Sequence, residues 1–101
     1  MRFPAFACLA LLATAASAST EASWRASNAA GRAACIRAAG LRAATASAPV
    51  GFSDAIGRDA ILVTGVYRQA FMKGARGTML CLYDRRTHNA EVAEAKGWSA
   101  R

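Results

Sequence analysis

Three side chains in the second half of the chain have the types that a thiol-dependent catalytic site needs. Cys81 lies seven residues before His88, and Asp84 lies between them. A cysteine attacks as its thiolate, and a histidine held by a carboxylate can accept the proton. A turn between two strands would bring Cys81 near His88. This arrangement allows the hypothesis of a thiol-dependent enzyme.

The first 18 residues decide which compartment those side chains occupy. Arg2 precedes an apolar run, Phe6–Ala13, and small residues follow as far as Ala18. This is the layout of a secretory signal peptide, and the run is shorter than the roughly 20 apolar residues of a membrane-spanning helix. We expect cleavage near Ala18, loss of Cys8 with the leader, and a secreted or periplasmic domain over residues 19–101.

Cys35 and Cys81 are then the two remaining cysteines, and they can form only one intramolecular pair. Disulfides persist in oxidising compartments. Closing a loop of about 46 residues is worth roughly 4 kcal/mol, which is large beside the ~5 kcal/mol net stability of a small domain. We therefore predict a Cys35–Cys81 disulfide. A bonded Cys81 is not a nucleophile, so a non-enzymatic protein becomes the first hypothesis.

Other chemistries have little support in the sequence. There is one histidine, no Cys-x-x-Cys, no clustered carboxylates and no glycine-rich phosphate-binding motif. We therefore predict neither a metal site nor a cofactor.

Basic residues are the most prominent polar feature. The chain has 13 Lys and Arg side chains against 6 Asp and Glu, a formal net charge of +7. A cationic secreted protein tends to associate with anionic surfaces. The candidate anion- or partner-binding residues fall in two turns: Lys73, Arg76, Arg85 and Arg86. A strand of seven residues spans about 23 Å, so we expect two separate patches. Ordinary solvated turns are the alternative. Nucleic acid is disfavoured, because no aromatic residues alternate with the basic ones.

The elements that would position these residues form one small α+β domain. Residues 19–40 are alanine-rich with Gly40 at their end, which predicts a helix with Thr20 as its N-cap and Trp24 as a core anchor. Strands are expected over 41–47, 59–68, 78–84 and 90–95, with a loop over 48–54. The prediction is an N-terminal helix on a three- to four-stranded, mainly antiparallel sheet, stapled by the disulfide.

A single helix leaves one face of such a sheet uncovered. Alternation places Leu62, Val66, Leu80 and Leu82 on that face, as a candidate hydrophobic interface. We prefer the expectation that the loop around Phe52 and Phe71 folds over it. A homodimer or another partner is the alternative.

Two segments carry a resemblance to other proteins. Gly77–Thr87, preceded by Met72-Lys73-Gly74, and Cys35–Leu41 resemble segments of short uncharacterised secreted proteins of Gram-negative bacteria. The resemblance implies an exported domain and brings no activity with it.

The sequence supports three hypotheses of function. The first is a non-enzymatic envelope domain that binds a partner or an anionic surface through the second sheet face or the Lys73–Gly77 loop. The second is an inhibitor of a secreted hydrolase. The third is the thiol-dependent enzyme that uses Cys81 and His88.

Overall fold

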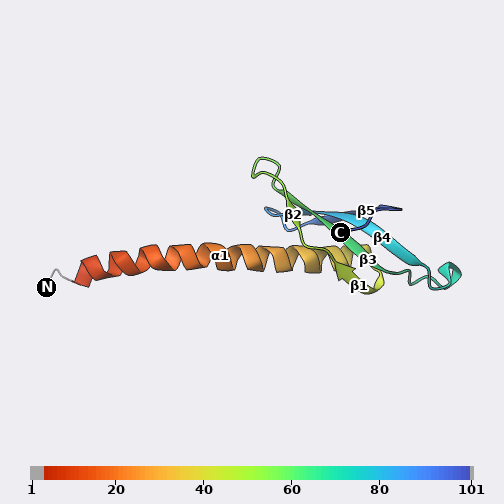
Figure 1. The fold of residues 1–101 in the computed structure, drawn as a ribbon, viewed down its shortest axis with the longest axis horizontal. Helices are drawn as coiled ribbons and strands as arrows, with labels where there is room; N and C mark the ends of the chain where they lie inside the picture. Colours follow the sequence, from red (N-terminus) through yellow and green to blue (C-terminus); the bar gives the residue numbers. More distant parts are fainter. Residues whose placement is uncertain (1–3, 101) are drawn as a thin grey trace.

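The computed structural model describes residues 4–100, with side chains described for residues 20–100. One helix packs on a mainly antiparallel sheet (Figure 1), which confirms the predicted fold class. The elements in chain order are α1 (Pro4–Ala39), β1 (Arg42–Ala46), β2 (Val50–Gly51), β3 (Arg58–Val66), the 3-10 helix η1 (Ala70–Met72), β4 (Arg76–Asp84) and β5 (Ala90–Glu94).

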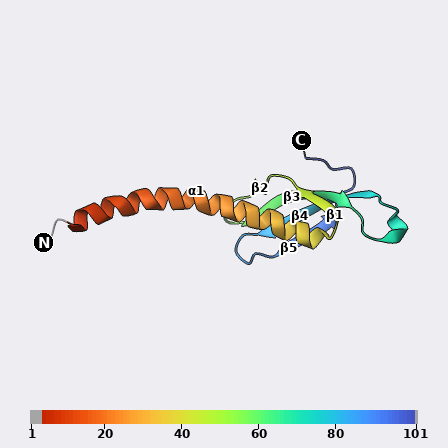
Figure 2. The ribbon, with the colours of Figure 1, turned by 90° about the horizontal axis from the view of Figure 1, so that it is seen from below.

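Helix α1 is longer than predicted. It begins at Pro4 rather than near Ser19, so Thr20 lies inside the helix and does not cap it. Proline is favoured in the first turn of a helix, and the alanine- and leucine-rich residues that follow are strong helix formers. The first half of α1 extends away from the sheet (Figures 1 and 2). The expected cleavage site at Ala18 lies within this helix, and the Cys8 side chain is outside the described residues.

Helix α1 ends at Ala39, directly before the glycine that the sequence indicated as its stop. Gly40 adopts a positive φ of 64°, and its N–H donates to the carbonyl of Ile36 at 3.3 Å. A residue in this left-handed conformation is a common helix stop, and glycine adopts it without steric cost. The chain then turns directly into β1.

The sheet has the order β1-β3-β4-β5, with β2 also paired to β3. Nine residue pairs join β3 to β4, from Arg58 opposite Asp84 to Val66 opposite Arg76. Strands β4 and β5 form the second hairpin, with Cys81 opposite Val92. The four predicted strands are therefore all present, within one to two residues of their expected ends.

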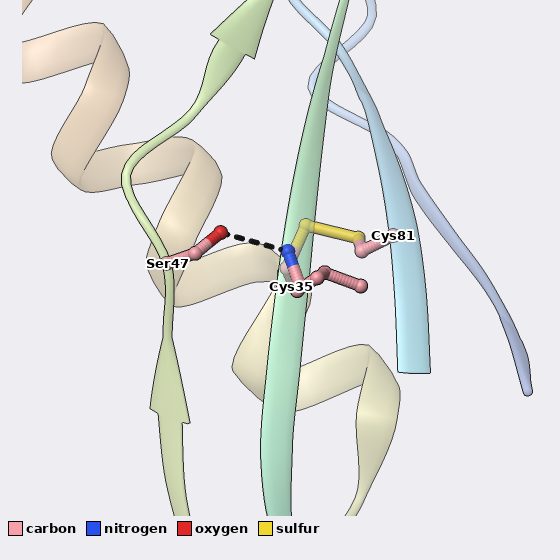
Figure 3. Close-up of a disulfide and its surroundings, with 4 residues drawn as sticks. Cys35, Ser47 and Cys81 are labelled. Atoms are coloured by element: carbon pink, nitrogen blue, oxygen red, sulfur yellow. Dashed lines mark hydrogen bonds between the residues drawn. A yellow bond between two sulfur atoms is a disulfide. The ribbon is translucent and has the colours of Figure 1, made fainter. Parts of the chain in front are cut away.

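The segment predicted as a loop over 48–54 contains a short additional strand. Val50 and Gly51 pair with Ala60 and Asp59, so β1 and β2 flank the same edge of β3 as one interrupted strand. At the interruption the Ser47 hydroxyl accepts a hydrogen bond from the Leu62 N–H at 2.9 Å (Figure 3). This side chain satisfies a strand N–H where the pairing of β1 and β2 with β3 is interrupted.

The core lies between α1 and the sheet. Its strand residues are the alternate positions Ile61, Val63, Cys81 and Tyr83, all almost fully buried. The Cys35–Cys81 disulfide crosses this core with a Cα–Cα distance of 5.8 Å (Figure 3), as predicted. The helix approaches the sheet closely because its facing side chains are small. A Cβ added to Gly31 would lie 2.9 Å from Cδ2 of Tyr83.

Trp24 is not the core anchor that the sequence predicted. Its side chain is 51% exposed. Among the described side chains, the buried face of α1 runs from Gly31 to Cys35, about two turns after Trp24. The tryptophan instead packs beside Arg85, whose guanidinium carbon lies 6.0 Å from the ring centroid.

A bulge in β1 explains why a glycine occurs near the end of β3. The register shifts between Arg42 and Thr45, and Ala43 has a positive φ of 50°. The bulged backbone presses on Gly65, where an added Cβ would meet the Arg42 carbonyl oxygen at 2.8 Å. The bulge lies on the strand next to Gly65, and Gly65 makes room for it.

Candidate functional site

The candidate basic residues lie at opposite ends of the sheet, as expected from the length of the third strand. Lys73 lies in the connection between β3 and β4, and Arg76 is the first residue of β4. Arg85 and Arg86 belong to the turn between β4 and β5. The first connection projects beyond the sheet, at the end of the molecule opposite to the start of α1 (Figures 1 and 2). The two pairs therefore cannot act as one binding groove, and each must be assessed by itself.

The projecting connection and the first residue of β4, together residues 67–76, are called the hairpin tip below. It is closed at its base by a hydrogen bond from the Tyr67 N–H to the Ala75 carbonyl at 2.9 Å. Within it, Lys73 donates its N–H to the Ala70 carbonyl and adopts a positive φ of 52°. Gly74 follows with a φ of 73°. The backbone is thus well ordered by its own hydrogen bonds.

Phe71 is the most exposed large apolar side chain among the described residues. It lies in η1 at the hairpin tip and is 76% exposed. Lys73 and Arg76 are also exposed, and neither side chain forms a hydrogen bond or ion pair with the described residues. The hairpin tip contains no acidic residue. An exposed aromatic ring is therefore combined with two free cations on one protruding loop.

Glu94 is the acid nearest the base of the hairpin tip, and it is already engaged. The Tyr67 hydroxyl donates a hydrogen bond to Glu94 Oε1 at 2.9 Å. This hydrogen bond to the carboxylate raises the pKa of the Tyr67 hydroxyl above its usual 10.0. Arg68, the third cation of the tip, donates from Nε to the Gly40 carbonyl at the end of α1.

Arg85 is not a free anion-binding residue. Its guanidinium pairs with the buried carboxylate of Asp59 and also donates to the carbonyls of Phe52, Ser53 and Arg58. Its side chain is only 14% exposed. The sequence reasoning missed Asp59, although alternation places it on the same face of β3 as Ile61 and Val63. A carboxylate at such a position needs a buried cation, and this signal could have identified Arg85.

Arg86 is exposed, and its turn is organised by Asp84. Oδ1 of Asp84 accepts hydrogen bonds from the N–H groups of Thr87 and Arg86, at 3.1 and 2.8 Å. These bonds hold the pKa of the Asp84 carboxyl below its usual value of 3.8, and the Arg58 guanidinium at 3.7 Å adds a smaller effect. Asp84 therefore shapes the turn, and Arg86 is exposed there without an ion pair among the described residues.

Cys81 and His88, the residues of the hypothetical thiol-dependent site, lie in different surroundings. Cys81 is fully buried and its Sγ is bonded to Cys35. His88 is exposed in the turn, with a φ of 65°, and stacks on Tyr83 with ring centroids 6.2 Å apart. Cys81 has no thiol in this structure, so the pair has no nucleophile. The described residues also contain no group of three or more His, Cys, Asp or Glu side chains that could hold a metal ion.

The second face of the sheet carries the candidate hydrophobic residues, as predicted. The register aligns Leu62 with Leu80 and Ala60 with Leu82, and all of these lie on the face away from α1, as does Val66. The expected cover forms only in part: Phe52 borders this face but is 52% exposed, and Phe71 projects at the hairpin tip. The C-terminal segment Trp98–Ala100 lies against this face instead, and an open cleft remains between them.

Comparison of the chain with protein-family models, with curated proteins and with solved structures gave no match. Within the part of the chain that the structure describes, no helix has the length and apolarity needed to cross a bilayer.

Proposed function

We propose that this protein is a non-enzymatic exported domain that attaches to anionic membrane surfaces through the hairpin tip. The observation that carries the proposal is the combination of Phe71, 76% exposed, with the free cations Lys73 and Arg76 on one protruding loop. Aromatic rings favour the interfacial region of a bilayer, and cations favour its anionic headgroups.

The expected attachment is weak and reversible. Each Lys or Arg near an anionic membrane contributes about 1 kcal/mol, and removing a phenylalanine side chain from water contributes roughly 1.5–3 kcal/mol when it is complete. Phe71 enters only as far as the ordered loop allows. The binding should weaken as salt rises, because headgroup attraction is screened within a Debye length of about 10 Å at 0.1 M salt.

Export supports this proposal. Residues 1–18 have the pattern of a signal peptide, and the buried face of α1 lies well beyond Ala18, so removal of the leader would spare the helix–sheet contacts. The Cys35–Cys81 disulfide also fits export, because disulfides persist in oxidising compartments. N-terminal sequencing of the exported protein tests this part: we expect a chain beginning at Ser19, and a protein that retains its first 18 residues would contradict it.

Vesicle co-sedimentation tests the attachment. The probes are vesicles of phosphatidylcholine alone and vesicles with an equal share of phosphatidylglycerol. We expect binding only to the anionic vesicles, and a several-fold loss in both Phe71→Ser and the double variant Lys73→Ala/Arg76→Ala. All proteins compared have the same N-terminus, so that any contribution of residues 1–18 to vesicle binding is equal in each.

Matched controls use an exposed aromatic and an exposed cation outside the hairpin tip. Phe52→Ser makes the same change in apolarity as Phe71→Ser, and Arg86→Ala removes one of the two charges that the double variant removes. Both should bind like the unmodified chain. Equal losses in the controls and the tip variants would show a diffuse charge effect. Unchanged binding in the tip variants would reject the hairpin tip as the attachment site.

A further inference from the structure

The open face of the sheet carries a cleft that is separate from the hairpin tip. A cleft of about 720 Å³ separates the strands from the C-terminal segment. Its apolar walls are formed by Val50 and Phe52 from the β2 region, by Leu62 and Leu80 from the sheet, and by Trp98 from the C-terminal segment. The volume falls within the range of about 300–1,000 Å³ that is usual for small-molecule sites.

Among the residues that the structure describes, the lining of this cleft has no charged side chain, although the chain carries a formal net charge of +7. The polar side chains on its walls are the serines Ser47 and Ser99. The Ser47 hydroxyl already accepts the Leu62 N–H and donates to the Ala48 carbonyl. A charged ligand group would therefore find no counter-charge among the lining residues and would lose its hydration without compensation. The chemistry of the walls favours an uncharged apolar ligand.

The wall formed by the C-terminal segment is only lightly held. Ala95 donates its N–H to the Thr78 carbonyl at 2.9 Å, and Trp98 donates its N–H to the Ala95 carbonyl at 3.1 Å. No hydrogen bond to a described residue fixes Ser99 or Ala100. Trp98 itself remains 59% exposed, so a ligand in the cleft would cover apolar surface that now faces water.

We propose that this cleft binds a small, uncharged apolar molecule, such as the alkyl chain of a neutral lipid or alcohol, between the sheet and Trp98. The ligand would pack on Leu62 and Leu80 and be covered by the indole ring. This site does not use the hairpin tip, so it can be present whether or not the protein attaches to membranes.

The test uses the uncharged fluorophore N-phenyl-1-naphthylamine with the full chain. In a Trp24→Phe background, Trp98 is the remaining tryptophan. We expect saturable binding, energy transfer from Trp98 to the probe, and displacement of the probe by dodecanol. Binding without transfer from Trp98 would place the probe elsewhere and overturn the proposal.

Two leucines of β4 provide a matched pair of variants. Leu80 lines the cleft, whereas Leu82 lies on the same face, is 41% exposed and does not line it. Leu80→Asn should lower the affinity for the probe at least tenfold, and Leu82→Asn should leave it within about twofold. Equal losses would indicate adsorption to the whole open face and overturn the proposal, as would an unchanged affinity in Leu80→Asn.

Trp98→Ala keeps the test decisive if Leu80→Asn fails to fold. This residue is largely exposed, so its truncation should leave the fold intact. The affinity, measured from the fluorescence of the probe itself, should fall several-fold because one wall of the cleft is removed. Unchanged probe affinity in Trp98→Ala would contradict the proposal.

Discussion

Arg85 and Asp59 form an ion pair that is almost entirely removed from solvent. Asp59 is 2% exposed, and its Oδ1 accepts a hydrogen bond from Nη1 of Arg85. The same guanidinium donates to the carbonyls of Phe52 and Ser53, so it fastens the loop after β2 to the turn after β4. The other carboxylate oxygen, Oδ2, is buried without a hydrogen-bond partner among the described residues.

Arg85→Met should therefore be strongly destabilising. Removing one partner of a buried ion pair leaves the other charge uncompensated, which typically costs about 3–5 kcal/mol. We expect a loss of that order in the free energy of unfolding, measured by urea denaturation at neutral pH. Arg86→Met, the same change at the adjacent exposed residue, should alter the free energy by about 0.5 kcal/mol or less.

A double-mutant cycle separates the pair from the carbonyl contacts. In the double variant Arg85→Met/Asp59→Asn no charge is left buried, so its loss should be smaller than the sum of the two single losses. Additive losses would show that Arg85 acts only through the loop carbonyls and that its pairing with Asp59 contributes little.

The Cys35–Cys81 disulfide should contribute a large share of the stability. It closes 46 residues of sequence and joins α1 to the central strand β4. The double variant Cys35→Ala/Cys81→Ala should lose about 2–5 kcal/mol in the free energy of unfolding, the usual range for a native disulfide of a small domain. Dithiothreitol should destabilise the unmodified chain similarly and leave the double variant unaffected. A reductant effect of equal size on both chains would contradict this account.

The predicted features are those that follow from local pattern. Alternation in Ile61–Val63 and in Cys81–Tyr83 identifies which strand residues face the helix, because successive side chains point to opposite faces. The two cysteines left after the apolar N-terminus could pair in only one way within the chain. The disulfide then placed the helix against that face, and the fold class followed.

The missed features depend on contacts between distant segments. Trp24 looked like a core residue because a large aromatic ring usually is, but burial depends on where the sheet ends beneath the helix. Arg85 looked like a free cation because its partners are carbonyls and a carboxylate some 26–33 residues away. No local pattern shows which face of the sheet the C-terminal segment packs against, beside Leu62 and Leu80.

Gly65→Ala should be destabilising although alanine is a modest change. The added Cβ would lie 2.8 Å from the Arg42 carbonyl oxygen and 2.8 Å from Cβ of Leu41. Backbone cannot yield as a flexible side-chain end can, so we expect a loss of about 1–3 kcal/mol, as for overpacking in a core. Thr64→Ala, which removes only the partly exposed bond to the Thr45 hydroxyl, is the control. A smaller loss in Gly65→Ala than in Thr64→Ala would show that the bulge in β1 adapts freely.

Because of the hydrogen bond from Tyr67 to Glu94, the free energy of unfolding should fall as the pH rises in the alkaline range. The pKa of Tyr67 is raised above 10.0 in the folded protein, chiefly by this bond to the carboxylate. Its contribution is therefore complete below pH 10 and is lost as the pH rises through the folded pKa. Glu94→Gln removes the negative charge, so the pKa of Tyr67 should move back toward 10.0 in ultraviolet difference titration. Tyr67→Phe serves to assign the ionisation step, which must disappear in that variant. If the step is unchanged in Glu94→Gln, Glu94 is not what raises the pKa of Tyr67.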